Sequence, residues 1–195
     1  MYNVYMVHNH IFVIRHGESE NNILQIDSAK LENKDKFGLT DKGKKQIELE
    51  TKKFTDFDLI ITSPLRRAKE TAMIFAKTSK CKVIENDLLS EVDHGDFELC
   101  SYEETDSFLA DHNDESVPFP NGESLLDAKN RTVQFLKKLN QNHLNKRILI
   151  VTHGHIALFI LELLLPDFNR QEAIKNYNDD KSRQVTEIPL VDTSP

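Results

Sequence analysis

The stretch Ile11-Phe12-Val13-Ile14-Arg15-His16-Gly17-Glu18-Ser19 decides how this chain is interpreted. Its four apolar residues end abruptly at Arg15-His16-Gly17, which predicts a buried strand with an arginine and an imidazole at its carboxyl end. A second such run, from Arg147 to Gly154, ends in His153-Gly154. Because ligands bind beyond the carboxyl ends of strands in open α/β sheets, the two runs predict two imidazoles at one sheet edge.

The composition is that of a soluble globular protein. The 195 residues suffice for one domain with a real core, and we expect a single domain over 1–195. Apolar residues make up 38% and charged residues 29% of the chain, which argues against disorder. The net charge of -7 argues against nucleic acid or an anionic membrane as partners, while still allowing a local arginine-lined pocket.

Cysteine usage and apolar runs indicate a cytoplasmic location. Cys81 and Cys100 have no close pairing motif, which favours reduced thiols over a disulfide. The amino terminus lacks a basic region followed by an apolar run, so no signal peptide is expected. The apolar stretch 156–165 contains Glu162 and is too short to cross a bilayer, so it predicts a buried helix. Nothing in the sequence indicates an oligomeric state.

Predicted strands and helices alternate along the chain. Thr40 is expected to cap a helix, Ser63-Pro64 to cap and start another, and 26–37 to form a surface loop. Strands are predicted at 11–14, 57–62, 81–85, 147–152 and 184–191, and helices from about Glu18 and over 41–53, 63–78, 101–110, 124–141, 155–165 and 169–176. This order predicts an α/β three-layer sandwich with a mostly parallel sheet and helices on both faces.

Polar residues that follow four of these strands suit phosphoryl transfer. They are Arg15 with His16, Arg66 with Arg67, Glu91, and His153. Arginines bind a phosphate with bidentate, charge-assisted hydrogen bonds, and helix amino termini add N–H donors. A neutral imidazole is a competent nucleophile, and a carboxylic acid can protonate the leaving oxygen. Such a set needs no metal ion.

In its motifs the chain resembles the histidine phosphatase superfamily, also called the phosphoglycerate mutase-like family. The matching blocks cover residues 11–165. They are Arg15 to Ser19 with Asn22, Leu39 to Gln46, Ser63 to Ala72, Glu91 to Glu98, Gly122-Glu123-Ser124 with Arg131, and His153-Gly154. The register of the third block selects Arg67 over Arg66 as the catalytic arginine.

The resemblance implies a mechanism and a set of site residues. It implies that His16 becomes phosphohistidine, while Arg15, Arg67 and His153 hold the phosphate oxygens. It implies that Glu91 protonates the leaving group and then activates water. The residues expected to bind substrate or line the pocket are Asn22, Glu18, Ser19, Gly154 and His155. The implied substrate is a small phosphorylated molecule or a phosphoprotein, with no cofactor and no metal.

Several residues have plainer interpretations that the sequence leaves beside the functional ones. The His-x-His pairs at His153/His155 and His8/His10 permit a metal site, but further ligands are missing. Glu98 is either a second pocket carboxylate or a capping group. We expect surface or structural roles for Arg66, Glu123, Arg131, His94, His112 and His143.

Two alternative functions stay open. A phosphoglycerate mutase shares the histidine, but mutases of this family usually have a longer chain and Arg-His-Tyr-Gly after the glutamate. Here Val92-Asp93-His94-Gly95 follows Glu91, which favours a phosphatase. A non-catalytic phospho-ligand-binding module would bind phosphate without turnover, although degenerate members typically lose the histidine or an arginine, and this chain keeps them.

Overall fold

A twisted five-stranded sheet forms the centre of the computed structural model, which describes residues 9–112, 114–165, 167–170, 173 and 186–188. The strand order is β3-β2-β4-β1-β5. The strands are β1 (His10–Arg15), β2 (Leu59–Thr62), β3 (Lys82–Glu85), β4 (Arg147–Thr152) and β5 (Thr186–Ile188). All neighbours pair in parallel except β5, which runs antiparallel to β1, so the mostly parallel sheet is confirmed.

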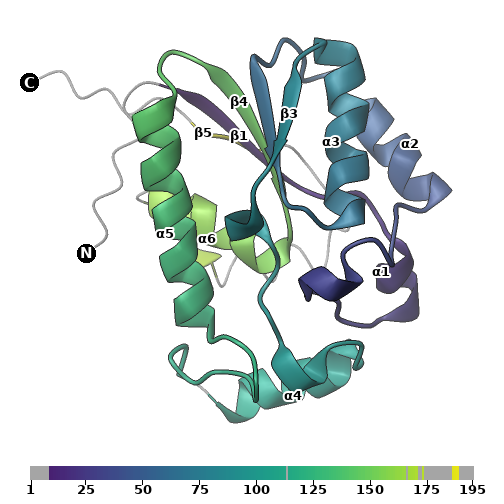
Figure 1. Ribbon diagram of the computed structural model, residues 1–195, viewed down its shortest axis with the longest axis vertical. Helices are drawn as coiled ribbons and strands as arrows, with labels where there is room; N and C mark the ends of the chain where they lie inside the picture. Colours follow the sequence, from purple (N-terminus) through teal and green to yellow (C-terminus); the bar gives the residue numbers. More distant parts are fainter. Residues whose placement is uncertain (1–8, 113, 166, 171–172, 174–185, 189–195) are drawn as a thin grey trace, which may run out of the picture.

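Helices cover both faces of this sheet (Figure 1), as the sequence predicts. The helices α5 and α6 lie on one face, and α2 and α3 lie on the other. In the described residues the helices are α1 (Glu20–Leu24), α2 (Asp41–Glu50), α3 (Arg66–Ser79), α4 (Tyr102–Asp111), α5 (Leu125–Asn142) and α6 (Gly154–Leu164). The fold is therefore a three-layer α/β sandwich.

The alternation of side chains along β1 shows why its apolar run is continuous. Ile11 and Val13 pack into the core beneath α5 and α6, whereas Phe12 and Ile14 pack into the core beneath α2 and α3. Successive side chains of a strand point to opposite faces, so a strand covered on both faces needs apolar residues at every position. The strand thereby places its next residue, His16, at the carboxyl edge of the sheet.

Some local predictions are wrong, each for a physical reason. Ser63 does not cap α3: the helix begins at Arg66, and the Ser63 hydroxyl is drawn to a neighbouring histidine. Segment 26–37 is more than a surface loop, because Ser28 and Ala29 are buried. The predicted helix at 169–176 falls largely outside the described residues.

Other local predictions are confirmed. Thr40 caps α2 by accepting a hydrogen bond from the Gly43 N–H. Cys81 and Cys100 carry free thiols. In the described part of the chain, every helix is too short or too polar to cross a bilayer. At one end of the sheet, α1 and α4 lie close together (Figure 1), joined by a hydrogen bond from Asn22 Nδ2 to the Tyr102 hydroxyl.

Candidate active site

His16 comes directly after β1 and is held in a single tautomer. Its Nδ1 lies 2.8 Å from the Gly17 carbonyl oxygen, and its Nε2 lies 3.1 Å from Nε of Arg67. A carbonyl oxygen can only accept a hydrogen bond and a guanidinium can only donate one. The hydrogen of His16 is therefore on Nδ1, and the lone pair of Nε2 faces the arginine.

Arg67 occupies the first turn of α3 and is almost completely buried. Its Nη2 donates to the Ser28 carbonyl oxygen at 2.7 Å, so the guanidinium is fixed from two sides. Burial lowers the pKa of Arg67, but a guanidinium keeps its charge in proteins. Arg66 instead lies on the surface and pairs with Glu70 at 2.8 Å. These positions agree with the sequence register that selects Arg67.

His153 follows β4, and its imidazole meets that of His16 edge to face, with 5.1 Å between the ring centroids. Nε2 of His153 lies 2.7 Å from Oγ of Ser63. Within the described residues, its buried Nδ1 has no hydrogen-bond partner. Burial, assisted by the charge of Arg67, lowers the pKa of His153 well below its usual range, so the ring is neutral at pH 7.

Glu91 lies in the segment that follows β3, opposite the two histidines. Its carboxylate accepts hydrogen bonds from the N–H groups of Val92 at 3.0 Å and His155 at 3.4 Å. Burial alone raises the pKa of Glu91, but the imidazoles of His155, His153 and His94 and the Val92 N–H outweigh it, bringing the pKa to about 2. The histidine contribution shrinks when those rings are neutral, but the two N–H donors still favour the carboxylate.

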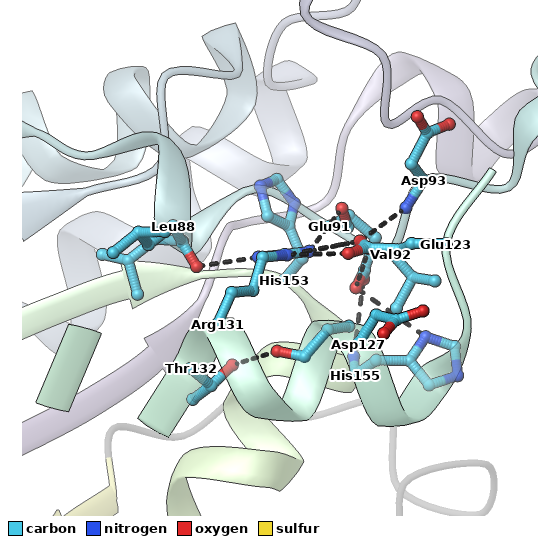
Figure 2. Close-up of polar contacts among 12 residues, drawn as sticks. Leu88, Glu91, Val92, Asp93, Glu123, Asp127, Arg131, Thr132, His153 and His155 are labelled. Atoms are coloured by element: carbon cyan, nitrogen blue, oxygen red, sulfur yellow. Dashed lines mark hydrogen bonds and ion pairs between the residues drawn. The ribbon is translucent and has the colours of Figure 1, made fainter. Parts of the chain in front are cut away.

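An ion pair between Arg131 and Glu123 holds the backbone around Glu91 in place (Figure 2). Arg131 on α5 donates to the carbonyl oxygens of Leu88 and Glu91 and pairs with Glu123 at 2.7 Å. Glu123 in turn accepts from the Asp93 N–H. The expected structural role of Glu123 and Arg131 is confirmed, because both side chains bind the backbone around the carboxylate.

A cavity of about 390 Å³ opens at this edge of the sheet. Of the residues predicted for the site, Arg15, His16, Arg67, Glu91, Gly154 and His155 line it. Gly154 lies beside the charged groups of the cavity: a Cβ there would lie 3.6 Å from Glu91 Oε2 and 3.8 Å from Arg15 Nη1, both ordinary contact distances. The cavity therefore brings the proposed nucleophile, the cations and the carboxylate together.

Four other residues predicted for the site are not among those that line this cavity: His153, Ser19, Asn22 and Glu18. Ser19 is buried and donates to Asn21 Oδ1 and Asn22 Oδ1 at the start of α1. Asn22 reaches the cavity through the hydroxyl of Tyr102, a lining residue. Glu18, expected at the pocket entrance, accepts from the Thr40 hydroxyl and pairs with Lys42 at 2.7 Å, so its contacts fix the start of α2.

The structure also adds residues that sequence reasoning missed. His94, expected on the surface or in a loop, lies in a loop but not on the surface, because it is only 1% exposed and lines the cavity. Asp27, Ser28 and Tyr102 line it as well, from segments without a periodic signal. Glu98 does not line this cavity; it is the C-cap residue of the short 3-10 helix Gly95–Phe97. It accepts hydrogen bonds from four groups of the 28–33 segment, on Ser28, Ala29, Lys30 and Asn33.

Comparison with known proteins agrees with this geometry. The profile of the histidine phosphatase superfamily (branch 1) matches residues 11–185. This chain belongs to the histidine phosphatase superfamily. The family resemblance read from the motifs is thus confirmed.

Relatives in this superfamily include both phosphatases and mutases. An uncharacterised phosphatase PhoE of Bacillus subtilis is 35% identical over 146 residues, covering 74% of this chain and 71% of the relative. Phosphoserine phosphatase 1 of Hydrogenobacter thermophilus is 30% identical over 151 residues, covering 73% and 70%. A 2,3-bisphosphoglycerate-dependent phosphoglycerate mutase of Bartonella quintana is 30% identical over 198 residues, covering 94% and 91%.

Solved structures share the histidine phosphatase fold of this chain. The α-ribazole phosphatase from Shigella flexneri superposes with a TM-score of 0.67 at 27% identity, covering 85% of this chain and 84% of that one. The five-stranded sheet with helices on both faces is thus the fold of the superfamily.

Proposed function

We propose that this protein is a metal-independent phosphatase that hydrolyses phosphate monoesters through a phosphohistidine on His16. The observation that carries the proposal is the fixed tautomer of His16, with the Nε2 lone pair facing Arg67 at 3.1 Å. An anionic phosphoryl group would replace the histidine as the acceptor of the Arg67 hydrogen bond. The same lone pair would then face phosphorus, which is the geometry that nucleophilic catalysis requires.

In the first step, Nε2 of His16 forms a bond to phosphorus while the ester P–O bond breaks. Arg15, Arg67 and the Nδ1–H of His153 would neutralise the charge on the non-bridging oxygens. Glu91 gives a proton to the leaving oxygen, so the alcohol departs neutral.

Glu91 takes up its proton from solvent when the substrate binds. The free carboxylate has a pKa of about 2, but a phosphate dianion beside it disfavours the ionised form and raises that pKa. In the second step, Glu91 takes a proton from water, the water oxygen bonds to phosphorus, and the N–P bond breaks. Inorganic phosphate and the resting His16 tautomer are regenerated.

The named relatives support a small phosphorylated substrate. They include phosphoserine phosphatases of Hydrogenobacter thermophilus and a metal-independent phosphoserine phosphatase of Arabidopsis thaliana that is 27% identical over 158 residues. We also propose one domain over 1–195 and a cytoplasmic location, which the free thiols of Cys81 and Cys100 support.

A phosphoglycerate mutase activity is the second candidate function, because the similarity to the mutase relative covers 94% of this chain. A mutase would convert 3-phosphoglycerate to 2-phosphoglycerate and would depend on a bisphosphorylated primer. A phosphatase would release inorganic phosphate without a primer. Following the two products from 3-phosphoglycerate, with and without primer, separates the two activities.

Hydrolysis of p-nitrophenyl phosphate in the presence of EDTA tests the proposal. The wild type should hydrolyse the ester, His16→Ala should not, and His112→Ala should match the wild type, because His112 is an exposed residue directly after α4. Turnover that EDTA abolishes would contradict metal independence, and near-normal turnover by His16→Ala would contradict the nucleophile. Phosphate binding without turnover of any monoester would identify a binding module instead.

A further inference from the structure

One part of the cavity lining has ionisable groups that are acidic or neutral. We call it the distal end and define it by Asp27, His94, Tyr102, Thr105 and Asp106. An apolar wall made by Leu109, Leu158 and Leu161 completes the cavity there. The cavity lining therefore combines the positive charges of Arg15 and Arg67 with the carboxyl groups of Asp27 and Asp106.

Asp27 is the central charge of the distal end. Its side chain is 16% exposed, and its contact with the nearest imidazole nitrogen, Nδ1 of His94, is 3.7 Å, which is longer than a hydrogen bond. Among the described residues, no lysine or arginine forms an ion pair with it. Burial raises the pKa of Asp27, with the His94 charge and a hydrogen bond from Thr105 acting in the opposite direction. The fold thus holds the carboxyl group of Asp27 in this cavity without a lysine or arginine in an ion pair with it, among the described residues.

His94 does not provide a cation either. Its side chain is 1% exposed, and neither ring nitrogen has a hydrogen-bond partner among the described residues. Burial lowers the pKa of His94, so the ring is neutral at pH 7. Buried polar groups in native proteins are generally hydrogen-bonded, and unpaired ones in a cavity point to a ligand that completes them. Two unpaired nitrogens therefore face the same space as the Asp27 carboxylate.

The distal end lies close to the phosphoryl site. Ser28, the residue after Asp27, accepts a hydrogen bond from Nη2 of Arg67 at 2.7 Å, and Nε of the same arginine contacts His16. Consecutive Cα atoms are about 3.8 Å apart, so Asp27 is one residue away from a group that touches the phosphate-binding arginine. A ligand that reaches both ends needs a spacer of only a few atoms.

From this geometry we infer that the distal end binds the alcohol part of the substrate, and that the preferred substrates are phosphate monoesters of short amino alcohols. The inference rests on the proposed phosphatase function. Asp27 accepts a charge-assisted hydrogen bond from the substrate ammonium, His94 binds a neighbouring polar atom, and the leucine wall contacts the carbon chain. The carboxylates of Asp27 and Asp106 disfavour an alcohol that carries a second negative charge.

Three esters of similar size and different charge test the inference. Phosphoethanolamine carries an ammonium, 2-hydroxyethyl phosphate a hydroxyl, and phosphoglycolate a carboxylate at the same position. We expect kcat/KM to fall in that order, by about tenfold or more between the first two, because a charged hydrogen bond is lost. Asp27→Asn should bring the ratio between the first two esters close to one. The control Glu103→Gln, an exposed carboxylate on α4, should keep the wild-type ratio.

Further measurements separate failure of this inference from failure of the proposed function. If p-nitrophenyl phosphate is hydrolysed but the three esters have equal kcat/KM, only the amine preference is overturned. The same conclusion follows if Asp27→Asn keeps the wild-type ratio of kcat/KM between phosphoethanolamine and 2-hydroxyethyl phosphate. If no ester is hydrolysed, the phosphatase proposal fails. The dissociation constants of the three esters, measured by calorimetry on the wild type, then decide the inference, and equal values overturn it.

Discussion

Ser63 is predicted to set the tautomer of His153, and the prediction can be worked out from the contacts. Its hydroxyl oxygen accepts a hydrogen bond from the Leu65 N–H at 3.2 Å and lies 2.7 Å from Nε2 of His153. Among these contacts, the nearest acceptor for the hydroxyl hydrogen of Ser63 is Nε2 of His153. If Ser63 donates to Nε2, the neutral His153 carries its hydrogen on Nδ1, where a phosphate oxygen can accept it.

The substitution Ser63→Ala removes this control and leaves Nε2 buried without a partner. An unpaired buried polar group costs about 1–3 kcal/mol, and about 1.4 kcal/mol corresponds to a tenfold change in rate. If the whole cost appears in the transition state, kcat/KM for p-nitrophenyl phosphate should fall roughly 5- to 150-fold. The thermal midpoint of the variant provides a control for the lost contact with Leu65.

A double-mutant cycle with His153→Ala decides whether Ser63 acts through the histidine. In the His153→Ala background, Ser63→Ala should have little further effect on kcat/KM, because the ring that it orients is gone. The reasoning is refuted if Ser63→Ala costs the same factor in both backgrounds. It is also refuted if the single variant keeps wild-type kcat/KM with an unchanged thermal midpoint.

Three other predictions follow from the described contacts. Glu91→Gln should lower kcat by about 10²–10⁴-fold for an alkyl phosphate but less for p-nitrophenyl phosphate, whose phenolate leaves without protonation, and equal losses would exclude the acid role. The affinity for sulfate, which does not titrate near neutral pH, should rise as the pH falls when it is measured by calorimetry. The reason is that a bound dianion raises the pKa of Glu91 from about 2, so the complex takes up a proton. The variant Glu91→Gln should bind sulfate without this pH dependence. Thr40→Ala should lower the free energy of unfolding by about 1 kcal/mol through loss of the α2 cap, measured in urea against the exposed Thr78→Ala, and an equal effect of both would contradict the capping role.

The sequence predicts the central layers of the fold because their signals are local. A run such as 11–14 is apolar at every position, as required for a strand with helices on both faces. The choice of Arg67 over Arg66 likewise depends on the register of neighbouring residues along the chain, and the structure buries the first and exposes the second. These predictions need no knowledge of distant contacts.

The distal part of the cavity could not be predicted in this way. Ser28 and Ala29 are buried, and their hydrogen bonds go to Glu98, which lies about 70 residues further along the chain. The role of Glu98 could not be predicted from the sequence, because the groups that donate hydrogen bonds to it come close only in the folded chain. His94 had the same difficulty: its burial comes from packing edge to face on Phe119, a residue in a proline-containing loop.

In His16 and His153, contacts with the protein determine which ring nitrogen carries the hydrogen. Each ring has one nitrogen that contacts an uncharged group of the protein, Nδ1 of His16 on the Gly17 carbonyl oxygen and Nε2 of His153 on the Ser63 hydroxyl. The remaining nitrogens must then differ in character, with a lone pair on His16 Nε2 and a hydrogen on His153 Nδ1. A neutral pair of imidazoles can therefore supply a nucleophile and a donor to one phosphoryl group. Charge is left to Arg15 and Arg67, and neither histidine has to gain a proton before the reaction begins.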